Sequence, residues 1–203
     1  MRHFAGMVLI VTLAGAIAPA ASGHFKLIEP LGWLVEDVRG DPQKIAPCGG
    51  TSANAGTPSN VINKIRGGQK LHIKIQETIY HPGHYRIALA VNSRAELPPD
   101  PEVTTRPSDR GPWSVSAVIQ NPPRIPVLAD GLFAHNTRPT GFFETDIDIP
   151  NINCAKCTLQ IIQFMAEHAL NRDGDYSYHH CADLQITADP AKPIATGWPA
   201  ARQ

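Results

Sequence analysis

Residues 158–165 read TLQIIQFM and residues 181–187 read CADLQIT, and a turn cluster, NRDGD at residues 171–175, lies between them. Short runs rich in Ile, Leu, Thr and Phe that are bounded by Asn, Asp and Gly are typical of strands connected by turns. The C-terminal part of the chain is therefore predicted to contain two such strands.

Three further runs extend this pattern toward the N-terminus. Residues 71–75 (LHIKI) and 143–149 (FETDIDI) alternate between apolar and polar residues, and residues 85–91 (YRIALAV) are rich in β-formers. Alternation of this kind is typical of strands with one buried face, and helical periodicity is rare in this chain. A chain of 203 residues with this spacing predicts one all-β domain, a β-sandwich with long loops.

The longest of these loops is rich in proline. Residues 93–126 hold eight prolines and no obvious strand. Two interpretations stay open for such a stretch, a functional surface loop and a disordered insertion. Residues 189–203 are rich in Ala and Pro and form a predicted tail, which leaves residues 24–188 as the predicted domain.

The first residues have the pattern of an export signal. Arg2 is followed by an apolar run at residues 7–18 (MVLIVTLAGAIA) and by the small residues Ala21-Ser22-Gly23. The run is shorter than the roughly 20 residues that span a bilayer, so a signal peptide over residues 1–23 is favoured over a membrane anchor. We expect cleavage before His24, a secreted or periplasmic protein, and no membrane span in the mature form.

The cysteines and the net charge limit the function classes. Four cysteines in an oxidising compartment are expected to pair, with three possible connectivities, although Cys154-x-x-Cys157 could also belong to a zinc site. The formal charge is zero, with 18 basic and 18 acidic residues. This balance removes the usual argument for nucleic acid or an anionic membrane surface as a partner.

Nine histidines are unusual for this length. An N-terminal His24 could chelate a metal through its α-amine and its Nδ1, and one more imidazole would complete a set of three nitrogens that suits Cu(II). His81 and His84, beside the start of a predicted strand, are the candidates for that imidazole. Tyr178 could fill an axial position, or it could be an ordinary strand aromatic.

Together these features resemble the lytic polysaccharide monooxygenases, and more narrowly their bacterial monooxygenase-like relatives. The resemblance rests on the His at the mature N-terminus, on His81-x-Gly83-x-Tyr85, on CTLQIIQF at residues 157–164, and on Tyr178-x-x-Cys181 followed by Ala-Asp-Leu. It covers most of residues 24–187, is thin in the proline-rich loop and is absent from the tail.

The resemblance implies an immunoglobulin-like or fibronectin-like β-sandwich with a copper histidine brace at one end. In it, His24 and His81 hold copper and Tyr178 is the axial group, and these three carry the catalytic site. Gln163, His168 and His84 are the implied second-sphere or neighbouring groups. The implied disulfides are Cys48–Cys181 and Cys154–Cys157.

The function implied is oxidative cleavage of a β-linked polysaccharide, chitin or cellulose, by a monomer that takes electrons from an external donor. The chain departs from the family at residues 164–170 and in the His179-His180 doublet. These departures favour an alternative, a periplasmic copper-binding or copper-delivery protein that keeps the brace without oxidising glycans. A third interpretation is a structural β-sandwich whose histidines are incidental.

Overall fold

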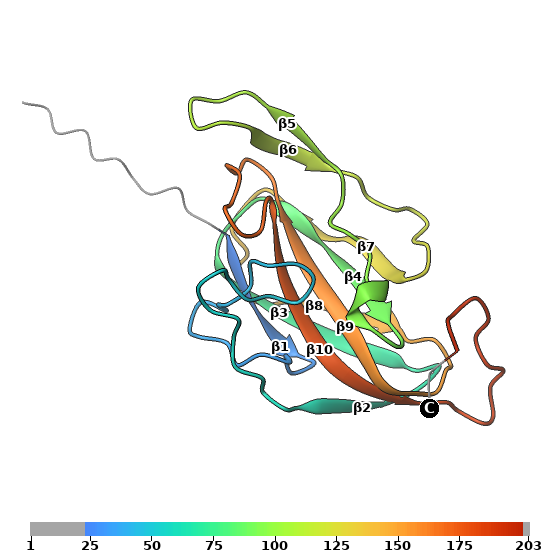
Figure 1. The fold of residues 1–203 in the computed structure, drawn as a ribbon. Coiled ribbons are helices and arrows are strands. Elements are labelled where there is room, and N and C mark those ends of the chain that lie inside the picture. Colours follow the sequence, from blue (N-terminus) through green and yellow to red (C-terminus); the bar gives the residue numbers. More distant parts are fainter. Residues whose placement is uncertain (1–22, 201–203) are drawn as a thin grey trace, which may run out of the picture.

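The computed structural model describes residues 23–200 (Figure 1). The predicted signal peptide, residues 1–23, lies outside the described residues except for Gly23. No helix in the described part is long and apolar enough to cross a membrane.

The fold is a sandwich of two main sheets, which confirms the all-β prediction. The first sheet has the order β1-β3-β8, and its strands are all antiparallel: β1 (His24–Glu29), β3 (Lys70–Ile79) and β8 (Phe143–Asp148). The second sheet has the order β2-β10-β9-β4-β7, antiparallel except where β2 pairs with β10: β2 (Ile62–Arg66), β4 (Gly83–Ala90), β7 (Val127–His135), β9 (Cys154–Met165) and β10 (Ser177–Thr187).

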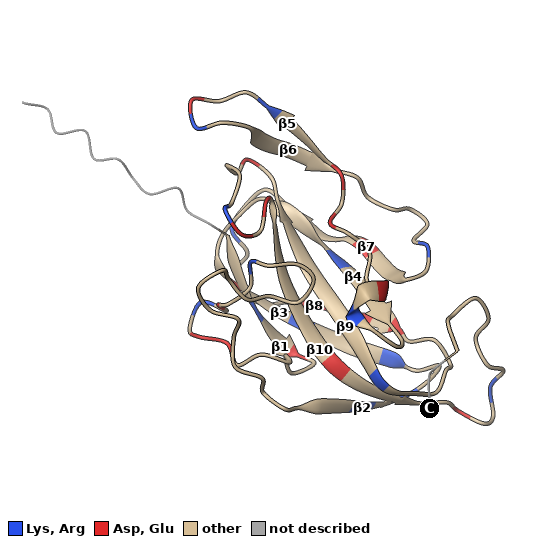
Figure 2. Cartoon of the chain, in the orientation of Figure 1, with Lys and Arg blue, Asp and Glu red and all other residues tan. Residues whose placement is uncertain are grey.

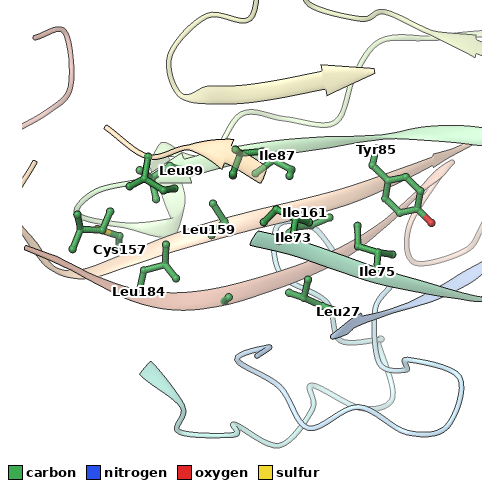
Figure 3. Packing of buried hydrophobic residues seen from close by; sticks show 14 of the residues in the cluster. Leu27, Ile73, Ile75, Tyr85, Ile87, Leu89, Cys157, Leu159, Ile161 and Leu184 are labelled. Carbon is green, nitrogen blue, oxygen red and sulfur yellow. The ribbon is translucent and has the colours of Figure 1, made fainter. Parts of the chain in front are cut away.

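The core lies between the two sheets (Figure 3). Alternate apolar side chains of β3, such as Ile73 and Ile75, meet those of β4 and β9, such as Ile87 and Ile161, and all four are fully buried. Each buried side chain of this size contributes about 1.5–3 kcal/mol relative to exposure, so the alternation seen in the sequence accounts for the pairing of these faces.

The proline-rich segment is better ordered than its sequence suggests. We expected no strand between residues 93 and 126, but the structure has a hairpin there, β5 (Val103–Arg106) and β6 (Trp113–Ala117), and a short 3-10 helix, Arg94–Glu96. The hairpin forms a separate two-stranded sheet that extends beyond the sandwich (Figure 1). The prediction missed it because Thr, Ser and Pro dilute the apolar signal of both strands.

The structure contains the two disulfides that the resemblance implies, Cys48–Cys181 and Cys154–Cys157, and no zinc site is formed by the second pair. Cys48–Cys181 joins the long loop after β1 to the last strand, and Cys154–Cys157 closes a short loop within β9.

Candidate functional site

His24 and His81 come together because β1 pairs with the end of β3. His24 is opposite Ile79 in this antiparallel register, and the turn that carries His81 follows directly. A Cβ added to Gly23 would lie 2.7 Å from His81 Cβ and 2.9 Å from Met165 Sδ. The backbone that enters His24 therefore lies against the His81 side chain.

The His24 ring is buried between a carboxylate and an aromatic ring. Its Nε2 is 3.1 Å from Asp41 Oδ2, and its ring centroid lies 5.1 Å from that of Tyr178 in an edge-on arrangement. The hydrogen bond to His24, against the opposing effect of burial, lowers the pKa of Asp41. Asp41 thus engages the nitrogen that a chelate with the α-amine would not use, and sequence reasoning did not identify this residue.

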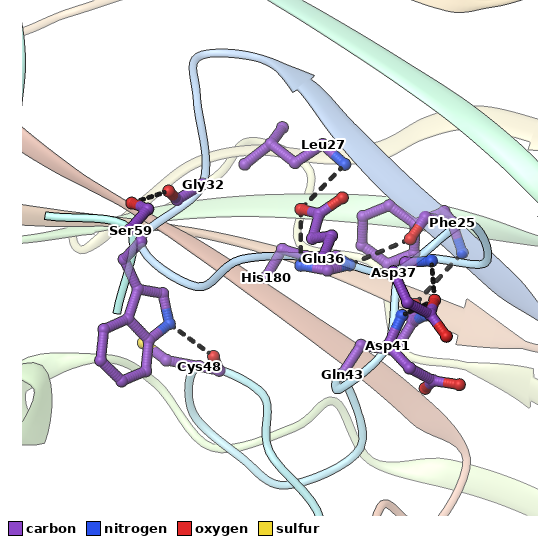
Figure 4. A network of polar contacts seen from close by, with 12 residues as sticks. Phe25, Leu27, Gly32, Glu36, Asp37, Asp41, Gln43, Cys48, Ser59 and His180 are labelled. Atoms are coloured by element: carbon purple, nitrogen blue, oxygen red, sulfur yellow. Dashed lines mark hydrogen bonds and ion pairs between the residues drawn. The ribbon is translucent and has the colours of Figure 1, made fainter. Parts of the chain in front are cut away.

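Asp41, which contacts His24, belongs to a compact turn that begins at Asp37 (Figure 4). The Asp37 carboxylate accepts from the backbone N–H groups of Arg39, Gly40 and Asp41, which is an Asx-type turn. Gly40 has φ +100°, and any side chain there would collide with the Phe25 carbonyl. An Asp-x-x-Gly pattern was the available signal, but only the fold shows that it faces β1.

His168 lies next to His81. The two ring centroids are 4.7 Å apart, and His168 is 3 % exposed. Burial, reinforced by the charge of His81, lowers the pKa of His168 to about 4, so its imidazole is neutral at physiological pH. The Ser114 hydroxyl of the β5–β6 hairpin donates to the carbonyl of Met165 and accepts from the N–H of His168, which fixes this loop.

Gln163 contributes to a buried polar network behind His81. Its Nε2 donates to Glu77 Oε1 at 2.7 Å, and the same oxygen is 3.2 Å from His135 Nε2 and 3.3 Å from the His81 backbone nitrogen. Burial lowers the pKa of His135, but the hydrogen bonds to Glu77 and to the Phe133 carbonyl outweigh it and raise this pKa overall. Glu77 was missed because a Glu in an alternating strand usually faces solvent.

The structure does not bring His84 into this group. Tyr85 points into the core, so His84, the next residue on β4, points away from it and packs on Phe164 with ring centroids 5.2 Å apart. Burial lowers the pKa of His84. His24, His81, Tyr178, Gln163 and His168 thus gather at one end of the sandwich, whereas His84 lies outside.

The His179-His180 doublet, which the resemblance does not account for, holds loops in place. His179 is 3.0 Å from the Lys44 carbonyl through Nδ1 and 2.8 Å from Asp100 through Nε2. His180 donates from Nε2 to the Phe25 carbonyl at 3.0 Å, and its Nδ1 is 3.2 Å from Glu36 (Figure 4). Both histidines therefore fasten the loop after β1 to β10.

The Glu36–His180 contact predicts a pH effect on stability. Burial raises the pKa of Glu36 to about 7, and burial lowers that of His180 to about 4. A carboxyl whose pKa is raised on folding stabilises the fold below its unfolded pKa and loses that contribution as the pH rises through about 7. Glu36→Gln removes this loss. Relative to that of the wild type, the free energy of unfolding of the variant should therefore rise by about 2–3 kcal/mol when the pH is raised from 5 to 8. Urea unfolding of the wild type and the variant at the two pH values measures this change. Glu102→Gln, at an exposed position, is the control. If the stability difference between Glu36→Gln and the wild type is the same at both pH values, the raised pKa of Glu36 is contradicted.

Within residues 23–200, no three His, Cys, Asp or Glu side chains are grouped so as to hold a metal ion. The ligand set predicted from the sequence is of another kind, since it combines two imidazoles with one α-amine.

Comparisons with known proteins add little to this site. No family model matches the chain, and no curated protein is similar to it. One solved structure, titled as a chitin binding domain from Burkholderia pseudomallei, is 12% identical, with a TM-score of 0.49 over 82% of this chain and 100% of that one.

Proposed function

We propose that the chain, once cut before His24, binds one copper ion and uses it to cleave a β-linked polysaccharide such as chitin or cellulose oxidatively. The ligands are the α-amine and Nδ1 of His24 and the imidazole of His81. The observation that carries the proposal is the packing of the Gly23–His24 backbone against the His81 side chain. Cleavage of that peptide would free an amine beside this imidazole.

The surroundings of His24 fit a copper brace. Asp41 engages Nε2, which favours the tautomer whose Nδ1 can join the amine in a chelate. Nitrogen ligands favour Cu(II) over other first-row divalent metals. Bound copper would supply the one-electron chemistry that activates an oxygen co-substrate after reduction by an external donor.

The chain's own residues would position and shield this centre. Tyr178, which is fully buried at the edge of the His24 ring, would shield a copper ion held by His24 on that side. Glu77 accepts from the His81 backbone N–H, so it fixes the turn that presents the imidazole. His168 lies next to His81 and is neutral, and its Nδ1–H donates to the Ala169 carbonyl, so its Nε2 is left as a hydrogen-bond acceptor beside this centre.

A copper carrier without glycan chemistry is the second candidate, and one observation favours it. Among the large hydrophobic side chains of the described residues, Phe142 is the one exposed aromatic, and Trp33, Tyr80 and Trp113 are half-buried. A row of exposed aromatic rings for stacking on sugars is therefore lacking in this part of the chain.

Two measurements test the proposal. Intact mass of the exported protein should show His24 as the first residue, and copper-loaded protein with a reductant should release oxidised oligosaccharides from chitin or cellulose. A matched chain that retains Gly23 should release none, because its amine is acylated. If the protein cut before His24 binds copper tightly and yields no oxidised product, the carrier is the function; if its N-terminus lies elsewhere, the brace is excluded.

A further inference from the structure

A groove of about 570 Å³ lies between the β5–β6 hairpin and the outer face of the second sheet. Its floor comes from His84 of β4 and Phe164 of β9, and one wall comes from Val115, Ser116 and Ala117 of β6. A volume of this size is in the range of small-molecule sites.

The groove adjoins the candidate copper site. Pro82 and Glu167 line it, and they are the chain neighbours of His81 and His168. The wall is fixed in place, because Ser114, which is fully buried, exchanges backbone hydrogen bonds with the loop that carries His168. The Glu167 carboxylate accepts from Arg106 and from Trp113 Nε1, which fastens the hairpin a second time.

His84 is the polar group built into the floor. It is 7 % exposed and makes no side-chain hydrogen bond to any residue between 23 and 200, although it packs on Phe164. Because burial lowers its pKa, its imidazole is neutral and offers one N–H donor and one acceptor. A ligand hydroxyl can use both, whereas His135 on the same groove has both nitrogens engaged by Glu77 and Phe133.

The charge of the groove excludes ionic ligands. No Lys or Arg lines it, and its single acidic residue, Glu167, is neutralised by Arg106 at 2.6 Å. Over the rest of the molecule both signs of charge are dispersed rather than gathered on one face (Figure 2). An anion would find no cationic partner here, and a cation would compete with Arg106.

We infer that this groove binds a single chain of a neutral glycan. Apolar walls at Val115 and Ile119, above the Phe164 floor, suit the C–H faces of sugar rings, and His84, Ser116 and Asn136 suit their hydroxyls. This inference rests on the proposed function for the choice of β-linked glycans, and it adds that the substrate is held as one chain in a groove beside the brace.

The test is binding of cellohexaose and of chitohexaose to copper-free protein by isothermal titration and NMR. We expect saturable binding of at least one of them. Ile119→Trp, at an exposed position, should fill the groove and weaken binding roughly 10-fold or more. Val118→Trp is the matched control, because Val118 is also exposed but does not line the groove, and it should bind like the wild type.

A second variant addresses the floor. His84→Ala should weaken binding about 5- to 20-fold by removing a donor and an acceptor, and His84→Gln should restore part of it. The inference is overturned if the wild type binds neither oligosaccharide, or if Ile119→Trp and His84→Ala both bind like the wild type. Copper titration of the same proteins distinguishes the two proposals. If the wild type binds copper tightly but binds neither oligosaccharide, the groove proposal is contradicted and the copper proposal is not.

Discussion

Replacing His81 with Ala should abolish tight copper binding by the chain that begins at His24, whereas His84→Ala should leave it intact. Removing a partner that only supports a metal ligand costs about 10- to 100-fold in affinity. Loss of a ligand itself is therefore expected to cost more than about 100-fold. Both imidazoles occur within four residues, but only His81 faces the backbone that enters His24.

The measurement is a competitive copper titration with a chelator of known affinity, on protein whose N-terminus has been verified by mass. Asp41→Asn provides an intermediate point, with a loss of about 10- to 100-fold, because it weakens only the hydrogen bond to His24 Nε2. Equal tight binding by His81→Ala and His84→Ala would reject the ligand assignment.

Removing the Cys48–Cys181 bond should lower the free energy of unfolding by roughly 5 kcal/mol, because it constrains a loop of 133 residues in the unfolded chain. Removing Cys154–Cys157, which are three residues apart, should cost only roughly 2 kcal/mol. All four half-cystines are at most 4 % exposed, so the packing losses of the two double Ala variants are comparable.

Urea unfolding of the wild type and of the two double Ala variants measures this difference. The Cys154→Ala/Cys157→Ala protein is the control, because it also replaces a buried disulfide with two Ala residues but removes only a short cross-link. Equal losses in the two variants would show that the long-range cross-link contributes no more than the local one.

Much of the fold could be predicted because its signal is local. The alternation at residues 71–75 and 143–149, and the apolar runs at 85–91 and 158–165, predicted strands that the structure contains. The β5–β6 hairpin, β2 and β7 were not predicted, since their exposed or irregular faces leave no clear period, and β1 (His24–Glu29) was not predicted either.

The candidate site divides in the same way. The resemblance to the monooxygenases indicated a copper brace of His24 and His81 with Tyr178 from the sequence, and it stays a prediction. The structure added the partners: Asp41 reaches His24 across 17 residues, and Glu77 meets Gln163 across 86. Sequence spacing cannot reveal such contacts, because the first depends on how a loop folds over a strand end and the second on how strands of the two sheets, β3 and β9, face each other.

The sequence by itself determined the fold class, the candidate ligands and the chemistry they could support, because periodicity and side-chain type are properties of short segments. The resemblance had favoured His81 over His84, but only the tertiary structure shows which of the two lies against the backbone that enters His24, and only it forms the groove beside them. The reason is physical: adjacent positions on a strand face opposite sides of the sheet, so the register of β4 directs His84 into the groove, while the turn before it directs His81 toward the start of β1.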